Sequence, residues 1–187
     1  MYFIFIIKQK NMKPFYYITI GILLTLTTIG FFAFKEAKSD LNNGTISITK
    51  ELEPNDPACL QMFYYIEQYA DSFDIPKKYA FGIANAETNY NGPFDWNYKP
   101  NLTSYCGAQG AMQIMPTTAA FINKEKVTGL KLKNDIKYNV KTSMKLLRYL
   151  HNQYGDWKLV FGAYNTGHPC VNAYANKVYK FDPEWIE

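Results

Sequence analysis

The amino-acid sequence predicts a mainly α-helical domain, and two kinds of observation support this prediction. Apolar residues recur at helical spacing in long stretches between residues 57 and 180. Asp, Pro and Gly residues stand where these stretches would begin and end as helices. No stretch is assigned as a strand. We therefore expect one globular helical domain at residues 57–180, followed by a short tail at residues 181–187.

The segment before this domain has a different composition. Residues 15–34 are twenty consecutive uncharged and mostly apolar residues, enough to span a bilayer as a helix. Three lysines within residues 1–14 precede them, which predicts a cytoplasmic amino terminus and an exported domain. The segment is either a retained membrane anchor or a cleaved signal peptide. The first residue of the translated protein is either Met1 or Met12. The polar residues 35–56 are then a linker.

The domain opens with two predicted helices. The first covers residues 57–73, with Asp56 as its cap. Its buried positions are expected to be Leu60, Phe63, Ile66 and Ala70. The second begins after Pro76 and covers residues 77–88. Because residues 79–86 are apolar nearly all round, we expect this second helix to lie buried at the centre.

A long irregular segment, residues 91–108, separates these helices from the later ones. A segment of this length inside a compact domain is usually functional. The later helices are predicted at residues 116–123, 135–154, 157–165 and 169–179. The longest of them is amphipathic, and its inward positions are Ile136, Val140, Met144 or Ser143, Leu147 and Leu150.

The predicted domain is basic. Residues 57–180 carry 14 Lys and Arg residues against 8 Asp and Glu residues. This charge suits an anionic polymer such as a nucleic acid or a cell-wall glycan, and a solvated face that favours solubility explains it equally well. Arg148 is the only Arg in the sequence, whereas readout of base edges favours Arg side chains. We therefore expect no nucleic acid as a partner.

The three cysteines match no spacing typical of a zinc site, and we expect no metal and no cofactor. An exported protein can hold one disulfide and one free thiol. Cys106 and Cys170 are then the favoured pair, because each adjoins one of the motifs described below. The alternative is that all three cysteines, including Cys59, are buried small residues.

Glu87 is the candidate catalytic residue. It lies at the end of the apolar helix, where burial raises the pKa of a carboxyl by penalising its charged form. The negative end of the helix dipole acts in the same direction. A carboxyl that stays protonated near neutral pH is suited to act as a general acid. The alternative is a Glu in a last helical turn that simply faces water.

Two further motifs supply side chains of the kind that bind sugars. The stretch at residues 110–116 turns at its first glycine and presents Gln113, whose amide both donates and accepts hydrogen bonds. The stretch at residues 163–167 supplies Tyr164, which we expect to hydrogen-bond the acid, and Asn165, which we expect to bind a sugar. Apolar faces for sugar rings, or a small satellite core, are formed by Tyr90, Phe94, Trp96 and Tyr98.

With these motifs in this order, the chain resembles the family 1, soluble-type (SLT-domain) lytic transglycosylases, which share the lysozyme-like fold. The Glu-Ser motif of that family resembles Glu87-Thr88, and its Ala-Tyr-Asn-x-Gly motif matches residues 163–167. Its Ser-x-x-Gly-Ala-x-Gly-Leu-Met-Gln motif matches Ser104, Gly107, Ala108, Gly110, Ala111, Met112 and Gln113. The resemblance implies that Glu87 is catalytic and that the substrate-binding residues are Thr88, Ser104, Met112, Gln113, Tyr164 and Asn165.

The chain departs from the family pattern at three places. Thr88 replaces Ser and keeps the hydroxyl, and Ala111 replaces Leu and keeps the apolar character. The distance in sequence from Glu87 to Gln113 is longer than usual because of residues 91–100. The resemblance therefore still implies activity, and the insertion bears on the shape of the glycan groove.

The resemblance implies cleavage of peptidoglycan glycan strands between N-acetylmuramic acid and N-acetylglucosamine, with formation of 1,6-anhydro-muramyl ends. The alternatives are a lysozyme-type hydrolysis helped by Asp95 or another acid, and a non-catalytic glycan-binding or assembly protein of the same fold. The expected location is the cell envelope, with the domain periplasmic or membrane-anchored and facing outward. Further partners are then the membrane, through residues 15–34 if they stay uncleaved, and by analogy a secretion or conjugation machine.

Overall fold

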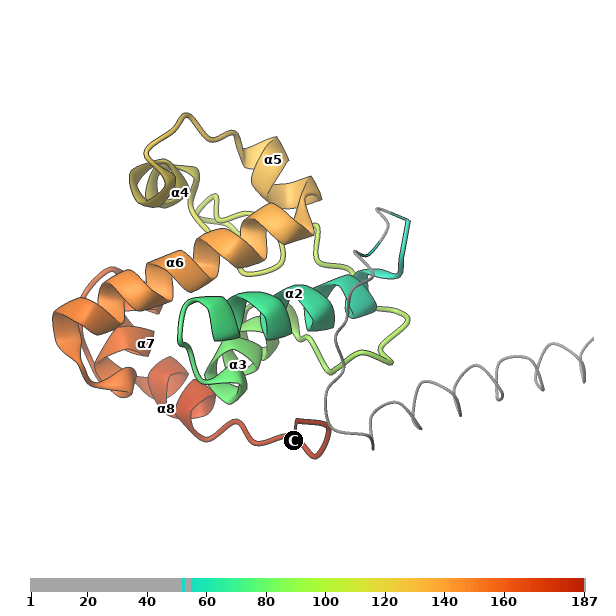
Figure 1. Cartoon of the computed structure of the whole chain (residues 1–187). Coiled ribbons are helices and arrows are strands. Elements are labelled where there is room, and N and C mark those ends of the chain that lie inside the picture. The colour runs from blue at the N-terminus through green and yellow to red at the C-terminus, as the bar shows by residue number, and fades with distance from the viewer. Residues whose placement is uncertain (1–51, 53–54, 187) are drawn as a thin grey trace, which may run out of the picture. The chain divides into compact units, whose positions relative to one another are not determined.

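The computed structural model describes residues 52 and 55–186 (Figure 1). Its helices in chain order are α2 (Ala58–Ser72), α3 (Lys77–Thr88), α4 (Pro116–Asn123), α5 (Gly129–Asn134), α6 (Ile136–Tyr154), α7 (Trp157–Thr166) and α8 (Ala173–Tyr179). Within these residues, extended backbone pairs only at isolated bridges that join Gln109 to Thr103 and to Ile114. The mainly helical fold class is therefore confirmed.

The predicted segments at residues 1–14 and 15–34 lie outside the described residues, as does most of the linker. In the part of the chain that the structure describes, no helix has both the length and the apolar character needed to cross a membrane.

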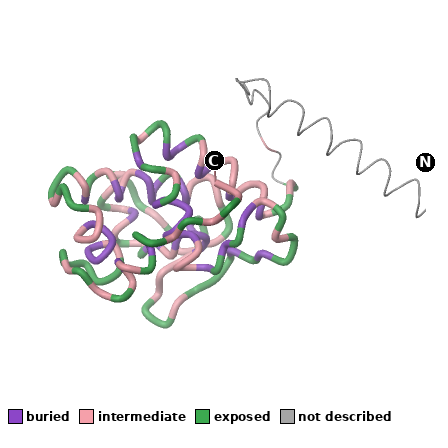
Figure 2. The backbone as a smooth tube through the Cα atoms, turned by 90° about the horizontal axis from the view of Figure 1, so that it is seen from below, coloured by how far each residue is buried: buried purple, intermediate pink, exposed green. Residues whose placement is uncertain are grey.

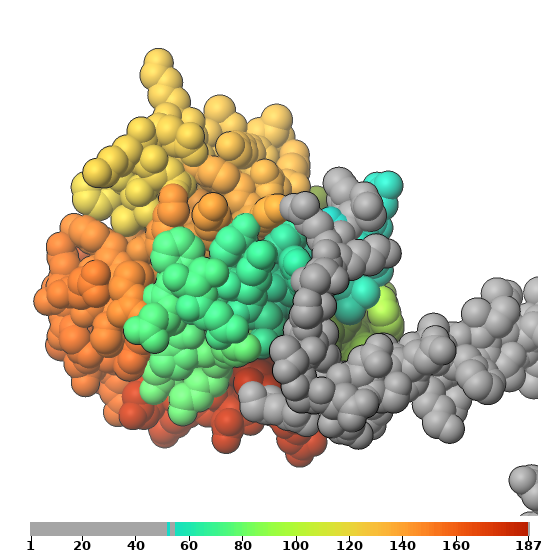
Figure 3. Space-filling model, viewed as in Figure 1, coloured from blue at the N-terminus to red at the C-terminus, as the bar shows by residue number. Residues whose placement is uncertain are grey.

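Helix α6 is the element against which most of the others pack. It contacts α2, α4, α5 and α7, with α4 and α5 above it and α2 below it in Figure 1. The space-filling view shows α4 and α5 as a raised part of the surface over α6 (Figure 3). The inward face of α6 is largely the predicted one, since its buried residues include Val140, Ser143, Met144, Leu147 and Leu150.

Helix α3 is the buried central helix that the sequence predicts. Six successive residues, from Tyr79 to Ala84, are buried, and the buried stretches gather inside the domain in Figure 2. Gly82 allows α8 to approach, because a Cβ there would lie 3.0 Å from the carbonyl oxygen of Val178. This close packing places the last turn of α3 beside α8.

The buried face of α2 agrees with the prediction at Ile66 and Ala70 but not at Leu60 and Phe63. Leu60 and Phe63 are only half-buried, whereas the buried positions are Cys59, Met62, Tyr65, Ile66, Tyr69 and Ala70. The reason is that two tyrosines join the core side of the helix, which rotates its buried stripe. The expected cap is also wrong, since Pro57 is the N-cap residue and no side chain caps the helix.

Two helix predictions in the second half of the domain need correction. The short helix α5 was missed, because its sequence is half polar and no apolar repeat marks it. The last helix begins at Ala173 and not at residue 169, with Asn172 accepting a hydrogen bond from the backbone N–H of Ala175 at 2.8 Å. The chain before it is not helical and lies against α7, where a Cβ on Gly162 would lie 1.8 Å from the carbonyl oxygen of Cys170.

Residues 181–186, assigned to a tail from the sequence, pack against the domain. The ring of Trp185 lies 4.9 Å from that of Phe81 and 5.8 Å from that of Tyr90, centroid to centroid. It also lies flat against Gly92, where a Cβ would come within 3.0 Å of the indole. The carboxyl-terminal segment therefore covers the core and holds the start of the irregular segment.

The three cysteines are free. Cys59 is buried, Cys170 is half-buried and Cys106 is exposed. The favoured disulfide between Cys106 and Cys170 is therefore absent from the structure, and the alternative of a buried small residue holds for Cys59 alone.

Candidate active site

Glu87 lies half-buried in the last turn of α3. Its Oε1 accepts a hydrogen bond of 2.6 Å from the hydroxyl of Tyr174. Burial is the largest effect on this carboxyl and raises its pKa, while the Tyr174 bond and the positive charge of Lys177 act to lower it. Because the net shift is upward, more of Glu87 is protonated at a given pH than of an exposed Glu. The structure therefore supports the first requirement of a general acid.

Tyr174, on α8, is the partner of the acid that the sequence analysis missed. It reaches Glu87 because α3 and α8 pack closely at Gly82. Burial raises the pKa of the Tyr174 phenol well above its usual value, and the Glu87 charge adds to the shift. No short motif marks this tyrosine in the sequence, and the small residue at position 82 is the one local signal that two helices meet there.

Tyr164 does not bond to the acid, contrary to expectation. Its hydroxyl donates to the carbonyl oxygen of Met112 at 2.7 Å and lies 3.4 Å from Oγ of Ser143. Burial is the largest cause of the raised pKa of the Tyr164 phenol, and the charge of Glu87 adds to the shift. Tyr164 therefore anchors the backbone of the neighbouring segment beside the acid.

That segment is a tight turn at residues 110–113, which we call the 110–113 turn. Gly110 and Gln113 both have a left-handed backbone, with φ of 76° and 49°. The side chain of Gln113 folds back, and its Nε2 donates to the carbonyl oxygen of Gly110 at 2.8 Å. Met112 is fully buried, so its side chain supports the turn from the core.

Thr88 links the acid's helix to this turn. Its hydroxyl lies 2.9 Å from the carbonyl oxygen of Ala111 and shares a hydrogen bond of 2.7 Å with the hydroxyl of Tyr98. Only 6% of Thr88 is exposed. In this arrangement Thr88 fixes the positions of two neighbouring segments and presents little surface to a ligand.

Ser104 and Asn165 differ in their accessibility. The Ser104 hydroxyl accepts a hydrogen bond of 2.9 Å from the backbone N–H of Ala108, which closes a local turn. Asn165 is exposed at the end of α7, where its Oδ1 accepts from Nδ2 of Asn172 at 3.3 Å. Of the predicted sugar-binding amides, Asn165 is exposed and Gln113 is half-buried.

The four aromatic residues after α3 fall into two pairs. Tyr90 and Tyr98 are buried, with rings 5.1 Å apart, so the alternative of a satellite core holds for them. Phe94 and Trp96 are 58% and 64% exposed. The satellite core therefore describes Tyr90 and Tyr98. The alternative of apolar faces for sugar rings applies to Phe94 and Trp96.

Asp95 acts on a different part of the molecule from Glu87. Its charge contributes to the raised pKa of Tyr90 and of Tyr98. The charged group that acts on Glu87 is Lys177, and no carboxylate in the described part of the chain contributes to its pKa. No cluster of His, Cys, Asp and Glu among these residues could hold a metal ion.

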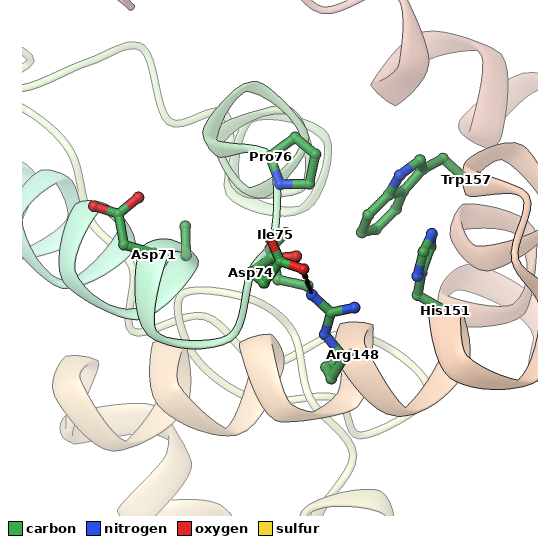
Figure 4. A pocket seen from close by; sticks show the side chains of 8 residues that line it. Asp71, Asp74, Ile75, Pro76, Arg148, His151 and Trp157 are labelled. Atoms are coloured by element: carbon green, nitrogen blue, oxygen red, sulfur yellow. Dashed lines mark hydrogen bonds and ion pairs between the residues drawn. The ribbon is translucent and has the colours of Figure 1, made fainter.

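A separate pocket of about 400 Å³ lies between α6 and the turn after α2 (Figure 4). Arg148 donates from Nε to the carbonyl oxygen of Phe73 at 2.7 Å and pairs with Oδ2 of Asp74 at 2.7 Å. His151 and Trp157 stack on the other side, with centroids 4.2 Å apart. None of the predicted site residues lines this pocket, so we assign Arg148 a structural role.

Comparison with known proteins decides the family. Residues 64–186 match the family described as "Transglycosylase SLT domain". The chain belongs to this family. The resemblance inferred from the motifs is thereby confirmed.

The relatives are much longer proteins. The soluble lytic murein transglycosylase of Escherichia coli (strain K12) is 31% identical over 106 residues, which cover 54% of this chain and 15% of the relative. The protein of the same name from Salmonella typhimurium is 33% identical over 107 residues, with the same coverage of 54% and 15%. This SLT-domain chain therefore spans a small part of the curated relatives it matches.

A solved structure of the 70 kDa soluble lytic transglycosylase from Escherichia coli is also similar. It shares 27% sequence identity, with a TM-score of 0.48 over 63% of this chain and 18% of that chain. A complex of a 70 kDa soluble lytic transglycosylase with bulgecin A gives 28% identity, a TM-score of 0.49 and the same coverage of 63% and 18%.

Proposed function

We propose that this SLT-domain chain is a peptidoglycan lytic transglycosylase of lysozyme-like fold. It cleaves the β-1,4 bond between N-acetylmuramic acid and N-acetylglucosamine and leaves 1,6-anhydro-muramyl ends. Family membership supports the proposal, as do relatives whose name is soluble lytic murein transglycosylase. The observation that carries it is Glu87, a half-buried carboxyl of raised pKa that accepts a hydrogen bond from the Tyr174 hydroxyl.

The proposed reaction uses Glu87 twice. The protonated carboxyl gives its proton to the glycosidic oxygen, and the bond from that oxygen to C1 of N-acetylmuramic acid breaks. The carboxylate then accepts the proton of the C6 hydroxyl of the same sugar, and the C6 oxygen bonds to C1. No water is consumed, and Glu87 ends the cycle protonated as it began.

Two features of the site suit these two steps. Burial favours the protonated form that starts the reaction. The Tyr174 hydroxyl donates to the carboxylate that exists between the steps, so it stabilises that form and holds it in place.

The substrate-binding roles inferred from the family motifs remain proposals. Gln113 and Asn165 carry amides that suit sugar hydroxyls and acetamido groups. The other inferred residues support the backbone around the site. Thr88, Ser104 and Tyr164 do so through hydrogen bonds to backbone groups, and Met112 through its burial in the core.

The two alternative functions are less well supported. Most glycosidases that hydrolyse use a second carboxylate beside the acid. The charge of Asp95 raises the pKa of Tyr90 and of Tyr98, whereas the charge that acts on the pKa of Glu87 is that of Lys177. A protein that only binds glycan has no need of a half-buried acid with a raised pKa. The site therefore favours the transglycosylase reaction.

The place of action is part of the proposal. Peptidoglycan lies outside the cytoplasmic membrane, so the enzyme is exported to the cell envelope by residues 15–34. It is then periplasmic or anchored to the membrane facing outward. A small domain of this kind suits local opening of the wall, for which a secretion or conjugation machine is a client by analogy.

The substitution Glu87→Gln tests the proposal. Gln is nearly isosteric but transfers no proton, so lysis of purified cell wall should fall by about 10²- to 10⁴-fold while the helical circular dichroism stays unchanged. The matched control is Glu125→Gln, which changes an exposed Glu bonded to Tyr138 and should leave lysis intact. Substantial lysis by a folded Glu87→Gln variant would remove Glu87 from the mechanism.

A further inference from the structure

We propose that Asn139 is a positioning residue that sets the 110–113 turn, and with it Gln113, against the last turn of α3. Asn139 lies on α6, and none of its surface is exposed. It therefore touches no substrate and acts through the backbone of the turn. Its effect on catalysis rests on the proposed function, and its effect on the turn does not.

The amide of Asn139 is fully used by backbone groups of two other segments. Its Oδ1 accepts a hydrogen bond of 2.9 Å from the backbone N–H of Met112. Its Nδ2 donates to the carbonyl oxygen of Gln109 at 2.8 Å and to that of Leu132 at 2.9 Å. One side chain thus satisfies an N–H and two carbonyl groups, and it ties the turn to both α5 and α6.

The turn packs on this amide without spare room. A Cβ on Gly110 would lie 2.5 Å from Nδ2 of Asn139 and 2.1 Å from the carbonyl oxygen of Leu132. Only a glycine with its left-handed backbone permits this approach. The backbone of the turn at Gly110 therefore lies directly against the amide of Asn139 and the carbonyl group of Leu132.

Asn139 completes a set of three supports. The carbonyl oxygen of Ala111 accepts from Thr88, next to the acid, and that of Met112 accepts from Tyr164. Asn139 holds the N–H between these two carbonyls. Each of α3, α6 and α7 thus contributes one side chain to the same short backbone. Gln113 follows at once, in a left-handed backbone conformation that a non-glycine residue adopts only when its surroundings impose it.

No neighbouring side chain offers the same set of groups. Ser143, one turn further along α6, donates its hydroxyl to the carbonyl oxygen of Asn139 itself. An Asp at position 139 would keep the acceptor for Met112 but present an oxygen to two carbonyl oxygens. The backbone groups around position 139 therefore call for a side chain with two donors and one acceptor, and the Asn139 amide provides this set.

The first test compares glycan binding by variants of the full chain in the Glu87→Gln background. With an N-acetylglucosamine oligomer as probe, Asn139→Ala should weaken binding by about 10- to 100-fold, as expected for a binding group that is displaced. The control is Asn123→Ala, which loses an amide that bonds Tyr138 and Thr142 of the same helix rather than the 110–113 turn. This control should lower the melting temperature but change binding by less than about threefold.

A double variant separates positioning from general destabilisation. Asn139 acts through the turn that carries Gln113, so Asn139→Ala combined with Gln113→Ala should bind no more than about threefold more weakly than the worse single variant. Asn123→Ala combined with Gln113→Ala should instead show the product of the two single effects. Full additivity of the Asn139 and Gln113 changes would overturn the proposal.

Hydrogen exchange gives a readout that does not depend on any activity. The Met112 amide should exchange faster in Asn139→Ala than in the wild-type chain, while the amides in the middle of α6 keep their rates. If wild-type chain binds the oligomer but cleaves no wall, the proposed function fails and this test still stands. Unchanged exchange at Met112 with unchanged binding would reject the role of Asn139.

The isosteric change Asn139→Asp keeps the proposal testable if Asn139→Ala does not fold. Binding should be weakest at high pH, where the carboxylate donates to neither carbonyl oxygen, and should strengthen as the pH falls, because the protonated carboxyl donates to one of them. The equivalent change Asn123→Asp should show no such recovery. Binding by Asn139→Asp that equals wild type at every pH would contradict the proposal.

Discussion

Glu87 occupies a position where burial and hydrogen bonding act on one carboxyl in opposite directions. Burial raises its pKa, whereas Tyr174 and Lys177 act to lower it. An acid that must also serve as a base needs both influences, because neither its protonated nor its charged form can be strongly disfavoured. At the scale of single residues, the bond from Tyr174 is therefore the feature that tunes this balance.

The substitution Tyr174→Phe should move the pH dependence of the rate. The protonated form of Glu87 starts the reaction, so kcat/KM falls as the pH rises through the pKa of Glu87. Loss of the Tyr174 bond removes an influence that lowers this pKa, so the fall should shift to higher pH. The rate at the optimum should drop about tenfold, the equivalent of one strong hydrogen bond.

The measurement is kcat/KM for wall cleavage as a function of pH. The control is Tyr179→Phe, which removes the hydroxyl of another tyrosine on α8 and should leave the profile in place. A shift of the Tyr174→Phe profile toward lower pH would show that the bond does not stabilise the charged form of Glu87.

At the scale of elements, the sequence predicts those helices whose ends are marked locally. The limits of α3 and α4 agree with the prediction, because Pro76 and Pro116 mark their starts. The start of α8 could not be read in this way, since it depends on the close approach of Cys170 to Gly162 on another helix. The short helix α5 carries no apolar repeat, so periodicity does not predict it.

In the candidate site, likewise, the sequence predicts the residues that belong to local motifs but not the contacts between distant segments. Glu87, Gln113 and Tyr164 belong to short motifs, so their identities could be inferred from the sequence. Their contacts could not, because Tyr174 bonds Glu87 across 87 positions. The amide of Asn139, which meets the turn across 27 positions, is likewise invisible to periodicity or spacing.

The contact between the 110–113 turn and its neighbours predicts the effect of Gly110→Ala. A Cβ would lie 2.1 Å from the carbonyl oxygen of Leu132 in a left-handed backbone. Strain and overpacking should together lower the free energy of unfolding by about 2–5 kcal/mol. Denaturant unfolding measures this change.

Gly155→Ala is the matched control for this element. Gly155 has a φ of 69°, but no atom lies within 4 Å of the place that an added methyl group would take, so only the backbone cost of about 1 kcal/mol applies. Equal losses of stability in the two variants would show that a side chain at position 110 meets no steric conflict with Leu132.

At the scale of the whole molecule, the carboxyl-terminal segment and the irregular segment stabilise one another. Trp185 packs on Phe81 from the central helix and on Tyr90, which directly precedes the irregular segment. Tyr90 in turn donates its hydroxyl to the carbonyl oxygen of Cys59 at 2.9 Å. The last residues of the chain thus help to hold the backbone that leads away from Glu87.

Trp185→Ala should therefore lower the free energy of unfolding by about 3 kcal/mol, as is usual for a large ring removed from a packed cluster. Trp96→Ala changes a tryptophan that is 64% exposed, and it should cost less than about 0.5 kcal/mol. Thermal or denaturant unfolding compares the two. A Trp185→Ala variant as stable as wild type would show that the segment at residues 181–186 is a true tail.

In the proposed reaction one carboxyl, that of Glu87, cleaves the glycan strand without water. The most direct test is digestion of purified peptidoglycan in water enriched in oxygen-18, with mass spectrometry of the released fragments. A transglycosylase should give muramyl ends that carry no heavy oxygen and weigh one water less than hydrolytic ends, because the C6 oxygen of the sugar itself closes the ring. Heavy oxygen at the new reducing ends would show hydrolysis and contradict the account.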